Sequence, residues 1–542
     1  MLRLKLGSVR YDTLLLAITT LFVVIVSVYV ARKEALLNSS NADVLVYNNL
    51  FSTPFTTDDI YLQSEHTFFI KYPLFWLENW LGFSTNVHVA FSIAALLVMN
   101  IGVCWLIYLF SQRNKLVSSL LFFALASITL FSSVQGYFWG YSALTIRNIE
   151  IPLTLFVIAW LLKQEKFFSF TNFALLTLLV ILNASDKLAL SIILGAAVLF
   201  LILDIIWQKR DLVKLWKNRG VFYGSLLCSV VGAFALEAIL KVLDILFLPK
   251  TAPLRTAESL VGVFSNIPVM LEDTLNLFGA NIFGKEILAL PPYILNFSIL
   301  LLASYAVYKV GKVASLKHEP AITFMLMMVV SSFLVYLLLH GTAADRYLVF
   351  IPFILLITAG YYFRDKRITV TTPWRRVALA ASALLLFVVL GFYSKQQRAA
   401  MAPENYNKLA PAISQTRDIS ADLLENDVEL LAGNYWIVHP NKFTFDQNFD
   451  NGLIIIPVVV INEQKVNFLR FISRDSWMKS PLKTGKKTAY VARDVDYTSL
   501  ALNKDLSVQK TFGTYAKKID YPQEKTTLYL YDYDIRKNID LE

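Results

Sequence analysis

Long apolar runs constrain this chain more than any other feature of its sequence. A transmembrane helix needs about 20 largely apolar residues, and about eleven such windows occur, centred near residues 20, 99, 125, 156, 175, 198, 233, 300, 330, 354 and 384. Hydrophobic residues make up 56% of the chain and charged residues 17%, which argues against a water-soluble globular protein. We therefore predict a mainly α, polytopic helical membrane protein with about 11 transmembrane helices.

Charge placement predicts the orientation of these helices. The first apolar run, 14–30, could suit a secretory signal, but it is too long and lacks a small-residue cleavage pattern, so we expect a retained helix. Lysine and arginine gather in alternate connecting segments, and the positive-inside rule then puts the N-terminus in the cytoplasm. This topology explains the net charge of +10, and nucleic acid is not an expected partner.

The apolar pattern ends near Tyr393, where the composition becomes that of a soluble domain. We expect residues 1–393 to form the membrane module, with a long first outer loop over 31–87, and residues 394–542 to form an extracytoplasmic α/β domain. A helical pattern covers 406–424. Polar turns bound several β-rich runs: VELLAG (428–433), GLIIIPVVVI (452–461), TAYVARD (488–494) and TTLYLYDYD (526–534).

Two adjacent acids, Asp58 and Asp59, lie in the first outer loop. An acid at this point can simply cap a helix. The segment HTFFIKYPLFWLENWLG follows, and it spaces aromatic residues along one predicted stripe: Phe68, Tyr72, Phe75, Trp76 and Trp80. Such a stripe predicts a helix in the membrane interface, interrupted only by Pro73. It would hold the acids at the water–lipid boundary, where a reaction between a lipid-anchored substrate and a water-side acceptor needs a base.

Cationic residues in other outer loops could hold a phosphate by charge-assisted hydrogen bonds. The candidates are Arg147, Lys187 and Arg346. Anchoring at lipid headgroups is the competing interpretation, and it explains Lys187 better than Arg346. Possible contacts to a groove or to the acceptor are Tyr72, Trp76, Glu150, Asp186, Lys241, His340 and Tyr347.

A seventh predicted span carries charge at membrane depth. Glu237, Lys241 and Asp244 share one helix face, so either a neutralised ion pair or a groove lining fits them. The histidines show no metal-ligand spacing, and the sequence lacks the nucleotide-binding and serine-hydrolase motifs.

With these residues, the sequence resembles the polytopic membrane glycosyltransferases of the GT-C fold, which use polyprenyl-phosphate-linked sugars. The matching segments are TTDDIYL (56–62), YPLFWLENWLG (72–82), RNIEIPL (147–153), DRYLVFIPFILL (345–356) and, in the C-terminal domain, LLAGNYWIVHPNKF (430–443).

The resemblance implies a role for three of these residues. Asp58 or Asp59 would be the general base, and Arg346 would bind the donor phosphate. Some members hold a divalent metal, here Mg or Mn, with a further acid of the second outer loop. Glu150 is the nearest candidate, although no D-x-D motif accompanies it.

The implied reaction moves a hexosyl or pentosyl group, with inversion, from a polyprenyl-phosphate donor to an extracytoplasmic glycan, lipid or protein acceptor. The lipid phosphate is already a good leaving group, so a base and a cation suffice. The implied location is the bacterial plasma membrane, and the implied process is glycan biosynthesis of the cell envelope.

Two other classes compete with this interpretation. A transporter or flippase of a lipid-linked saccharide or other amphipathic lipid should have spans broken by Gly or Pro near mid-bilayer, and no matching halves are seen in the sequence. A scaffold that only displays its C-terminal domain needs no acidic pair. For an enzyme, we expect that domain to shape acceptor access rather than perform chemistry.

Overall fold

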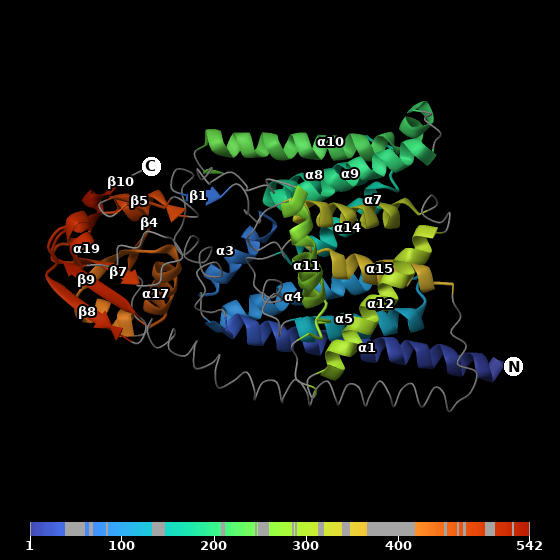
Figure 1. Ribbon diagram of the computed structural model, residues 1–542, viewed down its shortest axis with the longest axis horizontal. Helices are drawn as coiled ribbons and strands as arrows, with labels where there is room; N and C mark the ends of the chain where they lie inside the picture. Colours follow the sequence, from blue (N-terminus) through green and yellow to red (C-terminus); the bar gives the residue numbers. More distant parts are fainter. Residues whose placement is uncertain are drawn as a thin grey trace.

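The protein consists of a helical membrane module and a C-terminal domain built on a β-sheet (Figure 1). The computed structural model describes residues 2–37, 60–63, 69–82, 85–132, 147–207, 212–243, 246–247, 260–283, 287, 290–312, 319–338, 347–365, 418–448, 452–462, 465–469, 473–493, 505–522 and 525–540.

Among the described residues, six helices are long and apolar enough to cross a membrane, which identifies an integral membrane protein. They are α1 (Leu2–Leu37), α4 (Thr85–Phe110), α9 (Lys187–Trp207), α10 (Leu212–Val242), α12 (Leu290–Lys312) and α14 (Pro320–Leu338).

Four further predicted windows form shorter apolar helices. These are α5 (Lys115–Ser132), α7 (Glu150–Leu161), α8 (Phe170–Ser185) and α15 (Ile351–Phe363). The window near residue 384 lies outside the described residues, so the total of eleven membrane-crossing helices stays a prediction. One more helix, α11 (Leu260–Leu277), carries Pro268 within it.

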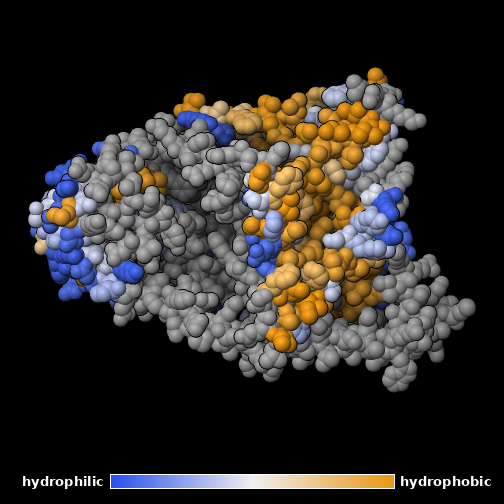
Figure 2. Space-filling view, viewed as in Figure 1, coloured by the Kyte–Doolittle hydropathy of each residue, from blue (hydrophilic) through white to orange (hydrophobic). Residues whose placement is uncertain are grey.

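Close helix packing builds the core of the membrane module. Helix α1 packs on α4 and α5, α9 on α14, α8 on α10, and α12 on α15. Helices α9 and α14 approach so closely that a Cβ on Gly195 would clash with Ser331 Oγ. Large apolar side chains remain exposed on the outside of this bundle, and Figure 2 shows them as a broad apolar surface beside the more polar C-terminal domain. Lipid is the natural cover for such a surface.

The aromatic segment of the predicted first outer loop folds as η1 (Phe69–Lys71) followed by α3 (Tyr72–Trp80). Pro73 lies in the first turn of α3 and so starts the helix rather than interrupting it. Phe75 is fully buried, whereas Trp76 is 60% and Trp80 70% exposed. The aromatic residues of α3 therefore do not form one exposed stripe, contrary to the prediction from the sequence. Phe75 and Glu78 lie on the buried face of α3, and Trp76 and Trp80 lie on its exposed face. Phe68 lies outside the described residues.

The C-terminal domain contains a seven-stranded sheet in the order β10-β5-β4-β3-β7-β9-β8. Its strands are β3 (Val428–Gly433), β4 (Ile454–Asn462), β5 (Lys465–Phe468), β7 (Lys487–Arg493), β8 (Lys517–Tyr521), β9 (Thr526–Tyr531) and β10 (Ile539–Asp540). The central trio β4-β3-β7 is parallel, while β5 on β4 and the β7-β9-β8 edge are antiparallel. All six residues of β3 are buried, as expected of a parallel strand at the centre of a sheet.

Helices accompany this sheet, and α17 packs on β4 and β3. The helices with printed bounds are α17 (Tyr435–Asn448), α18 (Asp475–Lys479), α19 (Asp505–Phe512) and η6 (Ile535–Asn538). Residues 418–425 are also helical, within the predicted 406–424 pattern, whose first part lies outside the described residues. The four β-rich runs predicted from the sequence correspond to β3, β4, β7 and β9, which confirms an α/β arrangement in the described part of this region.

A second, three-stranded sheet joins separate parts of the chain in the order β2-β1-β6. Strand β1 (Ile60–Gln63) belongs to the first outer loop, β2 (Leu246–Phe247) follows α10, and β6 (Ser473–Arg474) belongs to the C-terminal domain. Figure 1 shows β1 between the membrane module and that domain.

Candidate functional site

A buried ion pair joins η1 to the start of α7 at the base of α3. The Nζ atom of Lys71 lies 3.2 Å from Glu150 Oε2, and the two side chains are 0% and 6% exposed. The same Oε2 accepts a hydrogen bond from the backbone N–H of Asn148 at 3.2 Å. The Phe69 N–H donates to Ser185 Oγ at 3.0 Å, which ties η1 to the end of α8. Three segments distant in sequence therefore meet at Lys71.

A second buried ion pair lies beside the first. The Arg147 guanidinium donates to both carboxylate oxygens of Asp186, with 2.8 Å between Nη2 and Oδ1, and Asp186 Oδ1 also accepts the Leu188 N–H. Burial alone would lower the pKa of Arg147, but Asp186 holds it above its ordinary value. Asp186 thus fixes Arg147 and also caps the first turn of α9. A phosphate on Arg147, as predicted from the sequence, would compete with this carboxylate.

The two pairs interact electrostatically and form one network. Arg147 and Asp186 both act on the charge of Lys71, and the buried Tyr347, just before α15, acts on Arg147. The network draws on η1, the start of α7, the α8–α9 turn and the approach to α15. Two cations and two carboxylates leave its formal charge near zero.

Lys71 makes the stability of this network depend on pH. Burial lowers its pKa from 10.5 to about 8, and Glu150 offsets only part of that effect. Because the folded-state pKa lies below the unfolded value, the contribution of Lys71 to stability is lost as pH falls through about 8 and is fully present above 10.5. We expect the unfolding midpoint of wild type, relative to Lys71→Met, to rise between pH 8 and 10.5. A parallel pH dependence of the two proteins would contradict this pKa shift.

A second charged group lies at the start of α9 and the end of α10. Glu237 Oε2 is 2.5 Å from Lys187 Nζ, and Glu237 Oε1 is 2.7 Å from Lys241 Nζ. The lysine side chains are 31% and 36% exposed, whereas that of Glu237 is 10% exposed. We call Lys187, Glu237 and Lys241 the lysine triad; its formal charge is +1.

Of the two alternatives that the sequence left open for this helix face, the structure shows an ion pair between Lys241 and Glu237; the other carboxylate, Asp244, lies outside the described residues. The surface of α10 around the triad is apolar, with Phe234, Ile239 and Val242 exposed. The triad therefore offers a partly solvated cationic group at the end of an apolar helix face.

The other predicted contacts are divided between the surface and the interior. Trp76 is exposed on α3, whereas Tyr72 is half-buried and packs edge-on against Phe69, with ring centroids 5.3 Å apart. Four predicted residues lie outside the described part of the chain: Asp58, Asp59, His340 and Arg346.

Sequence reasoning missed Lys71 and a buried pair beneath α3. His88 Nδ1 lies 2.8 Å from Glu78 Oε1, and both residues are buried. A lysine and a glutamate within an aromatic block were the available signal, since charges on an apolar face require partners. The partners themselves, Glu150 and His88, could not be assigned without the fold.

A divalent metal at Glu150 does not fit the described residues. Glu150 Oε1 is buried without a hydrogen-bond partner among them, but Oε2 faces the Lys71 ammonium, which a cation would displace. The described part of the chain contains no group of three or more His, Cys, Asp or Glu that could hold a metal ion.

No protein-family model matches the chain, and no curated protein matches it.

Proposed function

We propose that the protein is a membrane glycosyltransferase that moves a sugar from a polyprenyl-phosphate donor to an extracytoplasmic glycan, lipid or protein acceptor. The proposal places it in the bacterial plasma membrane, with a cytoplasmic N-terminus and an external C-terminal domain. The observation that carries the proposal is the lysine triad at the end of the apolar face of α10.

The triad has the chemistry that a lipid phosphate requires. Two ammonium groups share one carboxylate, and each lysine is about one-third exposed, so both keep donors for an incoming phosphate. The exposed apolar side chains of α10 would take the prenyl chain in the lipid phase. Arg346, from the loop before α15, is the second proposed phosphate ligand.

The buried network supports the triad rather than performing the chemistry. Asp186 binds Arg147 and directly precedes Lys187, so this ion pair sets where α9 begins and where the Lys187 ammonium lies. The general base is proposed to be Asp58 or Asp59, which would take the proton of the acceptor hydroxyl as it attacks the anomeric carbon. The C1–O bond to the phosphate breaks in the same displacement, which inverts the anomeric centre, and the phosphate leaves as an anion held by the cations.

Helix continuity supports an enzyme over a transporter. None of the six long apolar helices within the described residues has a proline beyond its third residue, and each runs unbroken. Transporter sites are typically formed by broken helices near the bilayer midplane.

The test is incubation of the purified, reconstituted protein with a panel of polyprenyl-phosphate sugars, scored by release of the lipid phosphate. We expect Lys187→Gln and Lys241→Gln each to raise the KM for the donor about 10-fold, equivalent to about 1.4 kcal/mol. Lys309→Gln is the matched control, because Lys309 lies over the Tyr305 ring in α12, away from the triad. Movement of intact donor across the vesicle without cleavage would reject the enzyme and favour a flippase.

A further inference from the structure

We infer that β1 and its partners β6 and β2 form a splint, through which the C-terminal domain holds the first outer loop in a fixed position beside α10. The positioning role rests on the proposed function, whereas the pairing itself does not. The inference gives the C-terminal domain a second role in turnover, in addition to the acceptor access expected from the sequence.

The register shows how the splint joins the three segments. The first half of β1 pairs antiparallel with the C-terminal domain, Ile60 with Arg474 and Tyr61 with Ser473. The second half pairs parallel with the chain after α10, where Leu62 and Gln63 lie opposite β2. Strand β1 is central in the sheet, so neither of its neighbours comes from its own loop.

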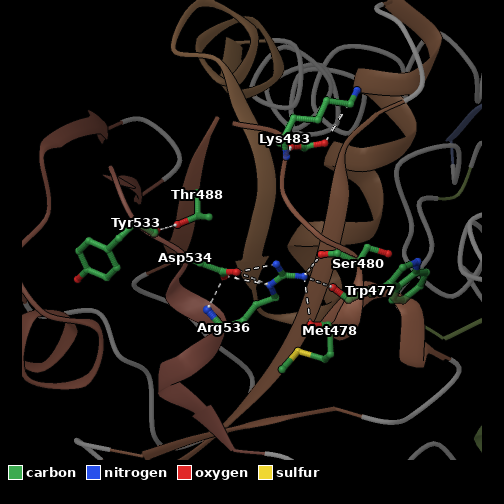
Figure 3. Close-up of polar contacts among 9 residues, drawn as sticks. Trp477, Met478, Ser480, Lys483, Thr488, Tyr533, Asp534 and Arg536 are labelled. Atoms are coloured by element: carbon green, nitrogen blue, oxygen red, sulfur yellow. Dashed lines mark hydrogen bonds and ion pairs between the residues drawn. The ribbon is translucent and has the colours of Figure 1, made fainter. Parts of the chain in front are cut away.

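The β6 side of the splint is firmly attached to its domain. Ser473 and Arg474 are buried, and α18 follows them directly. Figure 3 shows the Arg536 guanidinium directed at the end of α18, where Nη1 donates to the carbonyls of Met478 at 3.1 Å and Ser480 at 2.6 Å. Its other edge is bound by Asp534, with 2.6 Å between Nη2 and Oδ2. Arg536 lies in η6, directly before β10, and thereby fixes α18, and with it β6, to that part of the domain.

The β2 side of the splint reaches the lysine triad. Leu246 begins β2 only five residues after Lys241, and β2 packs against α10. At the other end of β1, Asp59 directly precedes Ile60 in the sequence. The splint therefore links the start of β1, next to the proposed base, with the proposed phosphate site.

Such a link matters because positioned groups lose much of their effect when displaced. A misplacement of about 1 Å can cost about 100-fold in rate. With only two residue pairs on each side, β1 depends on both neighbours for its position. The C-terminal domain is accordingly a positioning element, although it contributes no reacting group.

Cross-linking tests the pairing without any assay of activity. In a Cys104→Ala, Cys228→Ala background, Tyr61→Cys with Ser473→Cys should form a disulfide, because directly opposed residues place their Cβ atoms within reach. Ile60→Cys with Ser473→Cys is the matched control, since adjacent strand residues point to opposite faces. A protease site engineered between the two modules lets the bond be read as fragments that stay joined. Asp520→Cys with Thr527→Cys, an opposed pair of β8 and β9, reports that oxidation worked.

A backbone substitution tests the positioning role. Ser473→Pro removes a backbone N–H from β6, whereas Ser473→Ala keeps it and loses a hydroxyl that has no hydrogen-bond partner among the described residues. We expect Ser473→Pro to lower sugar-transfer turnover by about 10-fold or more and Ser473→Ala to leave it unchanged. A Gln63→Cys reporter should also react faster with a maleimide in Ser473→Pro than in Ser473→Ala. The oxidised Tyr61→Cys, Ser473→Cys protein should keep the turnover of its reduced form.

Each outcome decides one part of the inference. Absence of the Tyr61–Ser473 cross-link, with the β8–β9 control formed, would reject the splint. Cross-linking together with normal turnover and unchanged labelling in Ser473→Pro would reject the positioning role. A wild-type protein that cleaves no lipid-linked sugar would reject the proposed function, and the cross-linking and labelling results would still decide whether the splint holds the first loop.

Discussion

One of the two variants Asp58→Asn and Asp59→Asn is expected to lose sugar-transfer turnover by at least about 100-fold, with thermal stability nearly unchanged. Asparagine keeps the size and most hydrogen bonds of aspartate but cannot accept the proton of the acceptor hydroxyl. The variant that loses turnover identifies which of the two acids is the base. Turnover at saturating donor, measured beside the unfolding midpoint of each variant, is the direct test.

The control for this prediction is the cross-link between β1 and β6, which reports whether the splint is intact. If the lost activity reflects a missing base, the Tyr61→Cys, Ser473→Cys disulfide should form as well with Asp58→Asn or Asp59→Asn added as without them. Normal transfer by both variants, or activity lost only in step with folding, would exclude the acidic pair as the general base; a helix cap does not explain the pair either, because strand β1 begins directly after Asp59. The glycosyltransferase proposal would then lose its proposed base.

Breaking the Arg147–Asp186 pair is expected to destabilise the membrane module by about 3–5 kcal/mol in either Arg147→Ala or Asp186→Ala, since each leaves one buried charge without its main partner. The double variant Arg147→Met, Asp186→Leu should recover much of this loss, because similar apolar volume replaces both charges. Unfolding in detergent, followed by tryptophan fluorescence, measures the difference.

Lys187→Ala is the neighbouring control, and it should affect stability far less because Lys187 is partly exposed. If Arg147→Ala instead kept wild-type stability while donor binding was lost, Arg147 would be the phosphate ligand expected from the sequence. The buried pair would then be a resting arrangement that the donor displaces.

The helices were predictable from the sequence because hydropathy is a local property. Ten of the eleven apolar windows are centred on described helices, and strands β3, β4, β7 and β9 begin within about two residues of the four predicted runs, whereas β5, β6, β8 and β10 were not predicted. Burial within α3 was not predictable in the same way. Phe75 and Trp76 are neighbours of similar character, and only the packing of α3 against α4 determines which of them faces inward.

The candidate site was predictable as a set of residues but not as a set of pairs. The sequence indicated that Arg147, Asp186 and Lys187 share one membrane level, since loops on one side converge there. It gave no means of pairing Arg147 with Asp186 or Lys187 with Glu237, because those choices depend on which helices are neighbours. The splint was harder still, since β1 and β6 are four and two residues long and carry no periodic signal of their own.

The position of β1 has a consequence for how the protein is made. Its partner β6 is synthesised roughly 400 residues later, which at about 5–20 residues per second is a delay on the order of 20–80 s. Through that interval the β6 side of β1 has no strand to pair with, and under the proposed topology the pairing also requires that the C-terminal domain has been translocated and has folded. A chain that stalls or is cut before residue 473 therefore inserts its helices but never completes this sheet. Completion of the β2-β1-β6 sheet therefore requires that synthesis has passed Arg474.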